Sequence, residues 1–227
     1  MNPKAFIFDL DGVITDTTRY HYNAWKALAE QKGFAFNEVC NERLKGVGRN
    51  RCMEIILEEN GIRARFSDSE IQEMADEKNE IYLNMIEQIQ PADILPGICT
   101  FLEEAHQAGI RLALASASRN AERVLARLGL SARFDYRAEA KDIARGKPAP
   151  DIFLNCCAGL GVKPCEAVGF EDAQAGVKAI RAAGMISVGI GIKEPGIMPD
   201  IRLKDTCELQ LPRLLALLQP YKEKTND

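Results

Sequence analysis

The sequence has no cysteine pair in C-x-x-C spacing and no dense block of lysine and arginine. Its seven cysteines are odd in number, so neither a disulfide framework nor a zinc site is expected. The formal net charge is −4, and without a basic block the chain is not expected to bind nucleic acid or a membrane surface. An anionic ligand would therefore be held by a few focused positive groups.

Long apolar runs are also missing, and no segment approaches transmembrane length. The first residues lead into a short apolar segment that Asp9 and Asp11 interrupt, which is too short and too charged for a signal peptide. We therefore expect a cytoplasmic protein with reduced thiols. No internal repeat, low-complexity tract or signal for a partner protein is present, and we expect a monomer.

The order of apolar runs predicts an α/β fold. With 46% hydrophobic residues, the 227-residue chain can form a packed core. Strands are predicted at 5–8, 110–115 and 167–170, with a final strand at 186–189, and helices at 98–108, 120–128, 149–160, 173–183 and 209–218. Continuous apolar strands that alternate with helices indicate a parallel sheet covered on both faces. Beyond the final strand, Cys207 is expected to be a passive core residue.

A helical block interrupts this pattern directly after the first strand. Between residues 17 and 90 no convincing strand occurs, and Ser67 to Glu70 have capping-box spacing ahead of a helix. The first strand finds partners only after residue 96, so the block is an insertion. We predict an α/β core formed by residues 1–16 and 93–227, and an all-helical domain formed by 17–92.

Acidic and hydroxyl side chains follow the predicted strands, where ligands bind in open parallel sheets. These residues are Asp9, Asp11, Gly12 and Thr15 after the first strand, Ser116, Ser118, Arg119 and Asn120 after the next, and Glu171 and Asp172 after the third. Lys147 lies in a Gly-Lys-Pro loop ahead of a helix. A cluster of acids without His or Cys suits Mg²⁺, a hard cation.

Asp9 and Asp11 allow two interpretations. They are two residues apart, so in extended backbone their carboxylates leave the chain on the same side and require a cation, a shared proton or different roles. Alternatively, Asp-Gly is a good turn dipeptide, and a single D-x-D-G is more often a turn. Both acids end a buried strand and a second acidic pair ends another, which favours a catalytic role.

Four short motifs resemble those of the haloacid dehalogenase superfamily. Residues 8–17 (FDLDGVITDT) resemble the first motif, and Ser116 resembles the second. Lys147 in GKPAPD resembles the third, and Glu171-Asp172 the fourth. All four occur in the family's order and span almost the whole predicted α/β core. The resemblance implies a Rossmann-like core with an inserted helical cap domain.

The resemblance also implies an enzyme. Asp9 would be the nucleophile that becomes an aspartyl phosphate, and Asp11 the general acid and base. Ser116 and Lys147 would neutralise the phosphoryl oxygens. Mg²⁺ would be held by Asp9, the backbone carbonyl of Asp11, Asp172 and Glu171. Some branches of the superfamily need not protonate an alkoxide leaving group, and they lack an acid at the motif position that Asp11 occupies here. This chain has the acid.

The helical insertion resembles the cap of the β-phosphoglucomutase subfamily. By this resemblance, the substrate-binding residues are Thr17, His21, Trp25, Lys45, Gly46, Val47, Arg49 and Lys78, joined by Ala117, Ser118, Arg119 and Asn120. His21 and Trp25 are one helical turn apart and can face a sugar, but they are equally compatible with a core aromatic beside a satisfied histidine. Lys78 either faces an anion or snorkels at the edge of an apolar stripe.

Two residues depart from the subfamily pattern. Arg119 stands where a lysine is expected, and Cys52 where a serine is expected. Lys45 and Arg49 flank Gly46 in what resembles an anion-binding loop, a weak signal by itself. The departures bear on affinity and sugar preference rather than on the reaction type.

The implied reaction converts β-D-glucose 1-phosphate to D-glucose 6-phosphate. Phosphorylated Asp9 would transfer its group to the bound hexose phosphate, with β-glucose 1,6-bisphosphate as intermediate and primer. One alternative is a Mg²⁺-dependent sugar-phosphate phosphatase, in which water attacks the aspartyl phosphate. Another is an inactive phosphosugar-binding protein, whose expected mark is loss of the nucleophile or the acid; Asp9 and Asp11 are both present.

Overall fold

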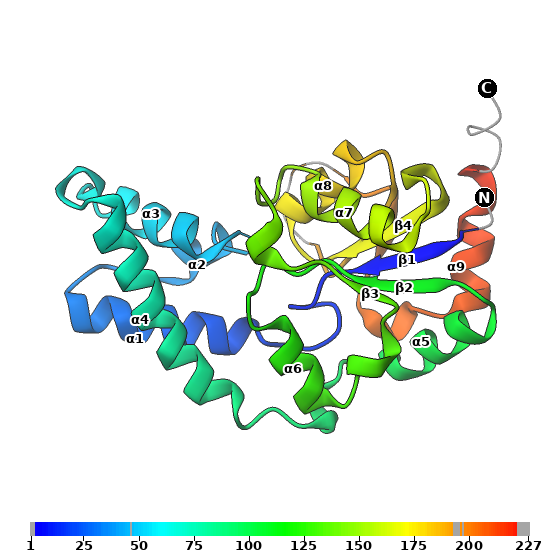
Figure 1. Cartoon of the computed structure of the whole chain (residues 1–227), viewed down its shortest axis with the longest axis horizontal. Helices are drawn as coiled ribbons and strands as arrows, with labels where there is room; N and C mark the ends of the chain where they lie inside the picture. Colours follow the sequence, from blue (N-terminus) through cyan, green and yellow to red (C-terminus); the bar gives the residue numbers. More distant parts are fainter. Residues whose placement is uncertain (1–2, 46, 193–195, 197, 222–227) are drawn as a thin grey trace. The chain divides into compact units, whose positions relative to one another are not determined.

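The computed structural model describes residues 3–45, 47–192, 196 and 198–221. The chain divides into two compact units, which we call the core unit (Met1–Asp16 and Gln90–Asp227) and the helical unit (Thr17–Ile89). The core unit contains β1 (Ala5–Phe8), α5 (Ile98–Gln107), β2 (Arg111–Leu114), α6 (Ala121–Leu128), β3 (Tyr136–Arg137), α7 (Asp151–Leu160), β4 (Ala167–Glu171), α8 (Gln174–Ala182), β5 (Ile186–Ile190), β6 (Ile201–Leu203) and α9 (Leu211–Leu217) (Figure 1). The helical unit contains α1 (Thr18–Lys32), α2 (Glu38–Glu42), α3 (Arg49–Glu59) and α4 (Asp68–Ile86).

The strands of the core unit form one parallel sheet in the order β3-β2-β1-β4-β5-β6. This confirms the predicted parallel sheet. The prediction of 186–189 as the final strand was wrong, because β6 follows it, and β3 was also missed. Both missed strands are short edge strands without the continuous apolar run that marks a buried central strand.

Alternate residues of β1 face opposite sides of this sheet, and helices cover both sides. Phe6 stacks on Phe101 of α5 with ring centroids 5.4 Å apart, and Phe8 stacks on Phe170 of β4 at 4.5 Å. Ile7 belongs instead to a cluster with residues of α7 and α8. The period of two in strand side chains produces this separation, and helices on both faces are confirmed.

In the helical unit, α1 and α4 pack side by side (Figure 1). Helix α1 ends at Gly33, whose φ of +73° is the left-handed conformation that glycine adopts readily. The capping box predicted at the start of α4 is confirmed: Ser67 Oγ accepts from the Glu70 N–H, and a Glu70 carboxylate oxygen accepts from the Ser67 N–H. The short helix α2 was not predicted.

The second boundary between the units follows Ile89, whereas the sequence places it after residue 92. Hydrogen bonds explain the difference, because Thr15 Oγ1 donates to the Asp93 carbonyl (2.7 Å) and Leu95 N–H donates to the Ile14 carbonyl (2.9 Å). The segment that contains Asp93 is thereby tied to the core unit.

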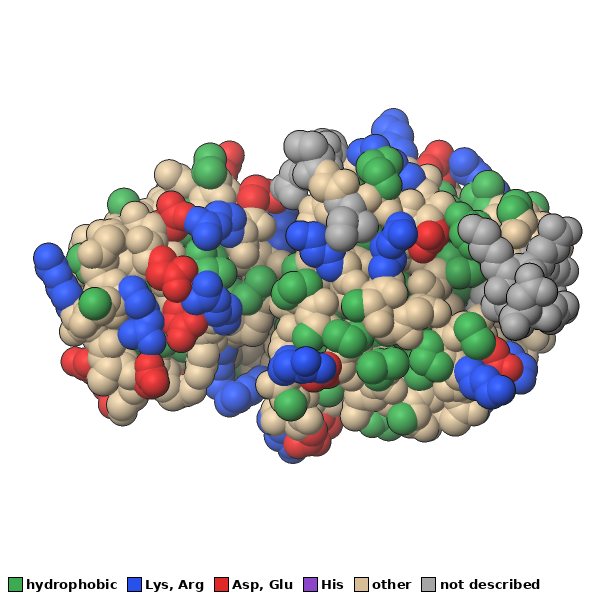
Figure 2. Space-filling model, turned by 90° about the horizontal axis from the view of Figure 1, so that it is seen from above, with side chains coloured by type: hydrophobic (Ala, Val, Ile, Leu, Met, Phe, Trp, Pro, Cys, Tyr) green, Lys and Arg blue, Asp and Glu red, His purple; other side chains and the backbone are tan. Residues whose placement is uncertain are grey.

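All seven cysteines lie in the described part of the chain and are free thiols. Cys207 is exposed, so its prediction as a core residue was wrong; its neighbour Thr206 is the buried residue of that 3-10 turn. Among the described residues, no helix has the length and apolar composition needed to cross a membrane. On the face shown in Figure 2, positive and negative side chains are interspersed over the helical unit, where ion pairs such as Arg51–Glu58 occur.

Candidate active site

The sheet register brings the residues that follow three strands to one level. Phe8 at the end of β1 lies opposite Leu114 of β2 and Phe170 of β4. The ladder continues one step further, since Asp9 N–H donates to the Phe170 carbonyl at 3.0 Å and Ala115 N–H donates to the Phe8 carbonyl at 2.7 Å. Asp9 is therefore fixed at the carboxyl end of a central strand.

Lys147 lies at the centre of this region with its side chain fully buried. Its ammonium donates to Asp9 Oδ1 (2.6 Å), Glu171 Oε1 (2.6 Å) and the Ala115 carbonyl (2.9 Å). These are three acceptors for the three protons of an ammonium. Burial by itself lowers the pKa of Lys147, but the carboxylates of Asp9 and Glu171 outweigh it and hold that pKa above its usual range. The lysine is therefore a fixed positive charge.

Two glycines leave room for the acidic side chains. A Cβ at Gly12 would lie 2.2 Å from Asp172 Oδ2, and Gly12 also has a φ of +83°. A Cβ at Gly176 would lie 1.8 Å from Glu171 Cδ. Glu171 Oε2 accepts from the N–H groups of Asp172 and Ala173, both at 3.1 Å. Burial raises the pKa of Glu171, while the Lys147 ammonium acts in the opposite direction.

Asp9, Glu171 and Asp172 each place a carboxylate oxygen within 4.8 Å of the others. The donors are all carboxylate oxygens. This donor set fits a hard divalent cation such as Mg²⁺. Asp11 N–H donates to Asp9 Oδ2 at 3.0 Å and so fixes the second oxygen of that carboxylate.

The loop after β2 is organised by its own hydroxyl groups. Ser116 Oγ accepts from the Ser118 N–H at 3.1 Å, and Ser118 Oγ accepts from the Asn120 N–H at 3.2 Å. Ser116 is buried and directly follows Ala115, whose carbonyl accepts a hydrogen bond from Lys147. Ala117 is partly buried, whereas Arg119 is exposed.

In the helical unit, His21, Trp25 and Lys78 come together between α1 and α4. Lys78 is 3% exposed, and its Nζ lies 2.8 Å from His21 Nδ1 and 4.8 Å from the centroid of the Trp25 ring. Burial and the positive charge of Lys78 hold the pKa of His21 well below its usual value. Lys78 is therefore an interior residue and not a side chain at the edge of an apolar stripe. Thr17, just before α1, is also buried.

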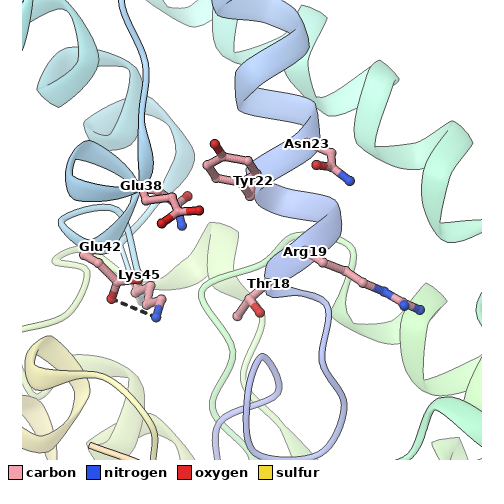
Figure 3. A pocket seen from close by; sticks show the side chains of 8 residues that line it. Thr18, Arg19, Tyr22, Asn23, Glu38, Glu42 and Lys45 are labelled. Atoms are coloured by element: carbon pink, nitrogen blue, oxygen red, sulfur yellow. Dashed lines mark ion pairs between the residues drawn. The ribbon is translucent and has the colours of Figure 1, made fainter. Parts of the chain in front are cut away.

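The remaining predicted residues of the helical unit have separate partners. Arg49 pairs with Asp76 of α4 at 2.9 Å, and Lys45 pairs with Glu42 of α2 at 2.8 Å. Lys45 also borders a hollow of about 250 Å³ that is lined by Thr18, Arg19, Tyr22, Asn23, Glu38, Asn41, Glu42 and Lys45 (Figure 3). In Figure 3, Tyr22 of α1 faces the acidic side chain of Glu38. Gly46 lies outside the described residues.

Cys52 is turned into the helical unit. Its Sγ lies 3.3 Å from the Val47 carbonyl and 3.5 Å from the Leu44 carbonyl. Burial raises the pKa of Cys52 to about 12, so the thiol stays protonated and can donate to these carbonyls. The expected serine is thus replaced by a group that holds the chain around Val47.

Sequence reasoning missed the contribution of Tyr82. Its ring stacks on His21, with centroids 4.1 Å apart and planes inclined by 26°. The available signal was its spacing, because Tyr82 lies one helical turn after Lys78. Gly176 was also missed, and only the side chain that it accommodates reveals its role.

Comparisons with known proteins identify the family of the chain. A family model described as haloacid dehalogenase-like hydrolase matches residues 3–184. The β-phosphoglucomutase of Bacillus subtilis is 42% identical over 219 residues, which cover 96% of this chain and 97% of that protein. The fructose-1-phosphate phosphatase YqaB of Escherichia coli is 34% identical over 187 residues, which cover 82% of this chain and 95% of that protein.

A solved structure extends the likeness to the fold. The crystal structure of β-phosphoglucomutase from Clostridium difficile matches with a TM-score of 0.93 and 41% identity, covering 99% of this chain and 100% of that one. The segment that the family model matches contains Asp9, Ser116, Lys147 and Glu171. The chain therefore belongs to the haloacid dehalogenase-like hydrolase family.

Proposed function

We propose that the chain is a Mg²⁺-dependent β-phosphoglucomutase that interconverts β-D-glucose 1-phosphate and D-glucose 6-phosphate. The observation that supports this chemistry is the buried Asp9 carboxylate. It accepts a hydrogen bond from Lys147, and one of its oxygens lies within 4.8 Å of carboxylate oxygens of Glu171 and Asp172. The 42% identity with the Bacillus subtilis β-phosphoglucomutase, over 96% of this chain, favours a mutase over a phosphatase.

In this proposal Asp9, Glu171, Asp172 and the backbone carbonyl of Asp11 hold Mg²⁺. Bound there, the ion supplies positive charge beside the phosphoryl oxygens, where charge must be neutralised during transfer. Lys147 supplies a second positive charge from the protein itself. Its Nζ already binds Asp9 Oδ1, so the group that neutralises the phosphoryl oxygens adjoins the nucleophile.

The two half-reactions use Asp9 and Asp11. An Asp9 carboxylate oxygen attacks phosphorus, the bond from phosphorus to the sugar oxygen breaks, and Asp11 gives its proton to that oxygen. In the other half, a sugar hydroxyl attacks the aspartyl phosphate, Asp11 takes the hydroxyl proton, and the Asp9 carboxylate is released. The product of the first transfer to sugar is β-glucose 1,6-bisphosphate, which also primes the enzyme.

The helical unit supplies substrate recognition in this proposal. Arg49 would bind the phosphate that is not being transferred, since a guanidinium suits a bidentate contact with phosphate, and Ser118 and Asn120 would assist. The sugar would be bound by Thr17, His21, Trp25, Lys45, Val47 and Lys78. Excluding water from the phosphorylated Asp9 is what separates a mutase from a phosphatase.

The test is an anomer-resolved ³¹P NMR assay with Mg²⁺ and a trace of β-glucose 1,6-bisphosphate. We expect glucose 6-phosphate to form from β-glucose 1-phosphate, little inorganic phosphate to appear, and the α anomer to remain unused. Asp9→Asn should abolish turnover. Steady release of phosphate without glucose 6-phosphate would establish the phosphatase instead, and binding without turnover would establish the inactive phosphosugar-binding protein.

A further inference from the structure

Tyr82 occupies a central place in the helical unit, although none of the predicted functions involves it. It is completely buried on α4, one helical turn after Lys78. Of the residues that are less than 2% exposed, its side chain is among the largest. From α4 the Tyr82 ring reaches His21 of the packed helix α1 as well as Lys78 of its own helix. These contacts are unusual for a buried side chain on the apolar face of a helix.

The Tyr82 ring contacts two polar side chains at once. His21 of α1 stacks on it with ring centroids 4.1 Å apart. Lys78 Nζ lies 4.7 Å from its centroid and 4.8 Å from that of Trp25, so the ammonium contacts two aromatic rings. Both distances are within the range of a cation–π interaction, which strengthens when the cation is removed from water. The rings thus compensate part of the desolvation of a lysine that is 3% exposed.

This arrangement determines which nitrogen of His21 carries the ring proton. A lysine ammonium can only donate, so at 2.8 Å from Lys78 Nζ the His21 Nδ1 must be the acceptor. Nε2 therefore carries the proton and is the ring donor. A free lysine side chain samples many rotamers, and confinement between two rings restricts Nζ to positions near Nδ1.

We propose that Tyr82 is a positioning residue that holds Lys78 and His21 in their hydrogen-bonded arrangement for the sugar phosphate. The role in substrate binding rests on the proposed function, whereas the role in fixing the Lys78–His21 bond does not. The aromatic ring carries the effect, through its face against His21 and Lys78. The phenol hydroxyl is not required.

The direct test is the ¹⁵N NMR signal of His21. The chain has two histidines, His21 and His106, so a His106→Gln background leaves a single imidazole to observe. Lys78→Met supplies the reference signal of Nδ1 without its donor. We expect Tyr82→Phe to keep the wild-type Nδ1 signal and Tyr82→Leu to move it to the Lys78→Met value. Tyr82→Met provides a second non-aromatic variant in case the leucine variant does not fold.

The kinetic test separates substrate binding from chemistry. We expect Tyr82→Leu to raise the KM for β-glucose 1-phosphate about tenfold, which corresponds to the loss of one desolvated cation–π contact. The kcat should change less than about threefold. Tyr82→Phe should stay within about twofold of wild type. Phe66→Leu is the matched control, because it removes an aromatic ring of the same unit that contacts Phe34 edge-on and does not stack on His21.

The proposal is overturned by any of three results. Wild-type Nδ1 signal in Tyr82→Leu and Tyr82→Met would show that the ring does not hold Lys78. Equal losses in Tyr82→Phe and Tyr82→Leu would assign the effect to the hydroxyl. The same changes in Phe66→Leu would show general loosening of the unit. Absence of mutase activity in the wild type would refute the proposed function alone, since the NMR comparison needs no substrate.

Discussion

Replacing Lys147 with methionine removes the charge from the candidate active site and keeps most of the side-chain volume. The ammonium lies 2.6 Å from both the Asp9 and the Glu171 carboxylates, and the side chains of Lys147 and Glu171 are fully buried. Removing one partner of a buried ion pair typically costs about 3–5 kcal/mol, because the remaining charge is left without compensation. We therefore expect Lys147→Met to lose about 3–5 kcal/mol of the free energy of unfolding in a chelating buffer.

The assay is urea unfolding followed by circular dichroism, with a chelator and again with saturating Mg²⁺. A cation bound by the three carboxylates restores the missing positive charge, so Mg²⁺ should stabilise Lys147→Met more than it stabilises the wild type. Lys178→Met is the control, since Lys178 is exposed on α8 and its loss should change stability by less than about 0.5 kcal/mol. Equal stability of Lys147→Met and Lys178→Met in chelator would refute the reasoning.

Three further variants test other parts of the structure. Gly12→Ala should weaken Mg²⁺ binding measured by calorimetry, because its Cβ would meet Asp172 Oδ2 at 2.2 Å; Gly109→Ala, with a similar φ and no atom within 4 Å, should not. Since the pKa of His21 is lowered in the folded protein, the unfolded chain binds the extra proton in acid, and the wild type loses stability below about pH 6.5. Relative to His21→Gln, the loss should reach about 1.4 kcal/mol at pH 5.5 in urea unfolding, and parallel pH profiles would contradict it. Arg49→Ala should lower mutase flux roughly 10- to 100-fold, the scale of a lost hydrogen bond to a charged group, with a smaller effect on hydrolysis of a small phosphate ester; equal losses would argue against binding of the distal phosphate.

The central part of the fold could be predicted because its signals are local and strong. The strands β1, β2, β4 and β5 are short apolar runs, and β1, β2 and β4 are each followed along the chain by segments with helical periodicity. The edge strands were missed since β3 has two residues and β6 has three, too few to establish a pattern. Cys207 was wrongly predicted to be buried because cysteine usually is. The residue types in that turn do not reveal that Thr206 takes the interior position.

The candidate site was predictable only in part. Residues that end parallel strands must meet at one edge of the sheet, which located Asp9, Glu171 and Asp172 together from their positions alone. The spacing of Lys78 gave the face of its helix, but not the rings of Trp25 and Tyr82 that surround its ammonium. Such contacts depend on how two helices pack, and periodicity describes each helix only by itself.

The three acceptors of Lys147 have a thermodynamic consequence for ligand binding. With each proton engaged by Asp9, Glu171 or Ala115, the ammonium can donate to an arriving phosphate only by giving up one of those bonds. A phosphate would also enter a site whose carboxylates already exceed its ammonium in charge. Cation and anion should therefore raise each other's affinity by the same factor, as reciprocity of linked equilibria requires. The site without ligands is thus biased against binding the anion alone.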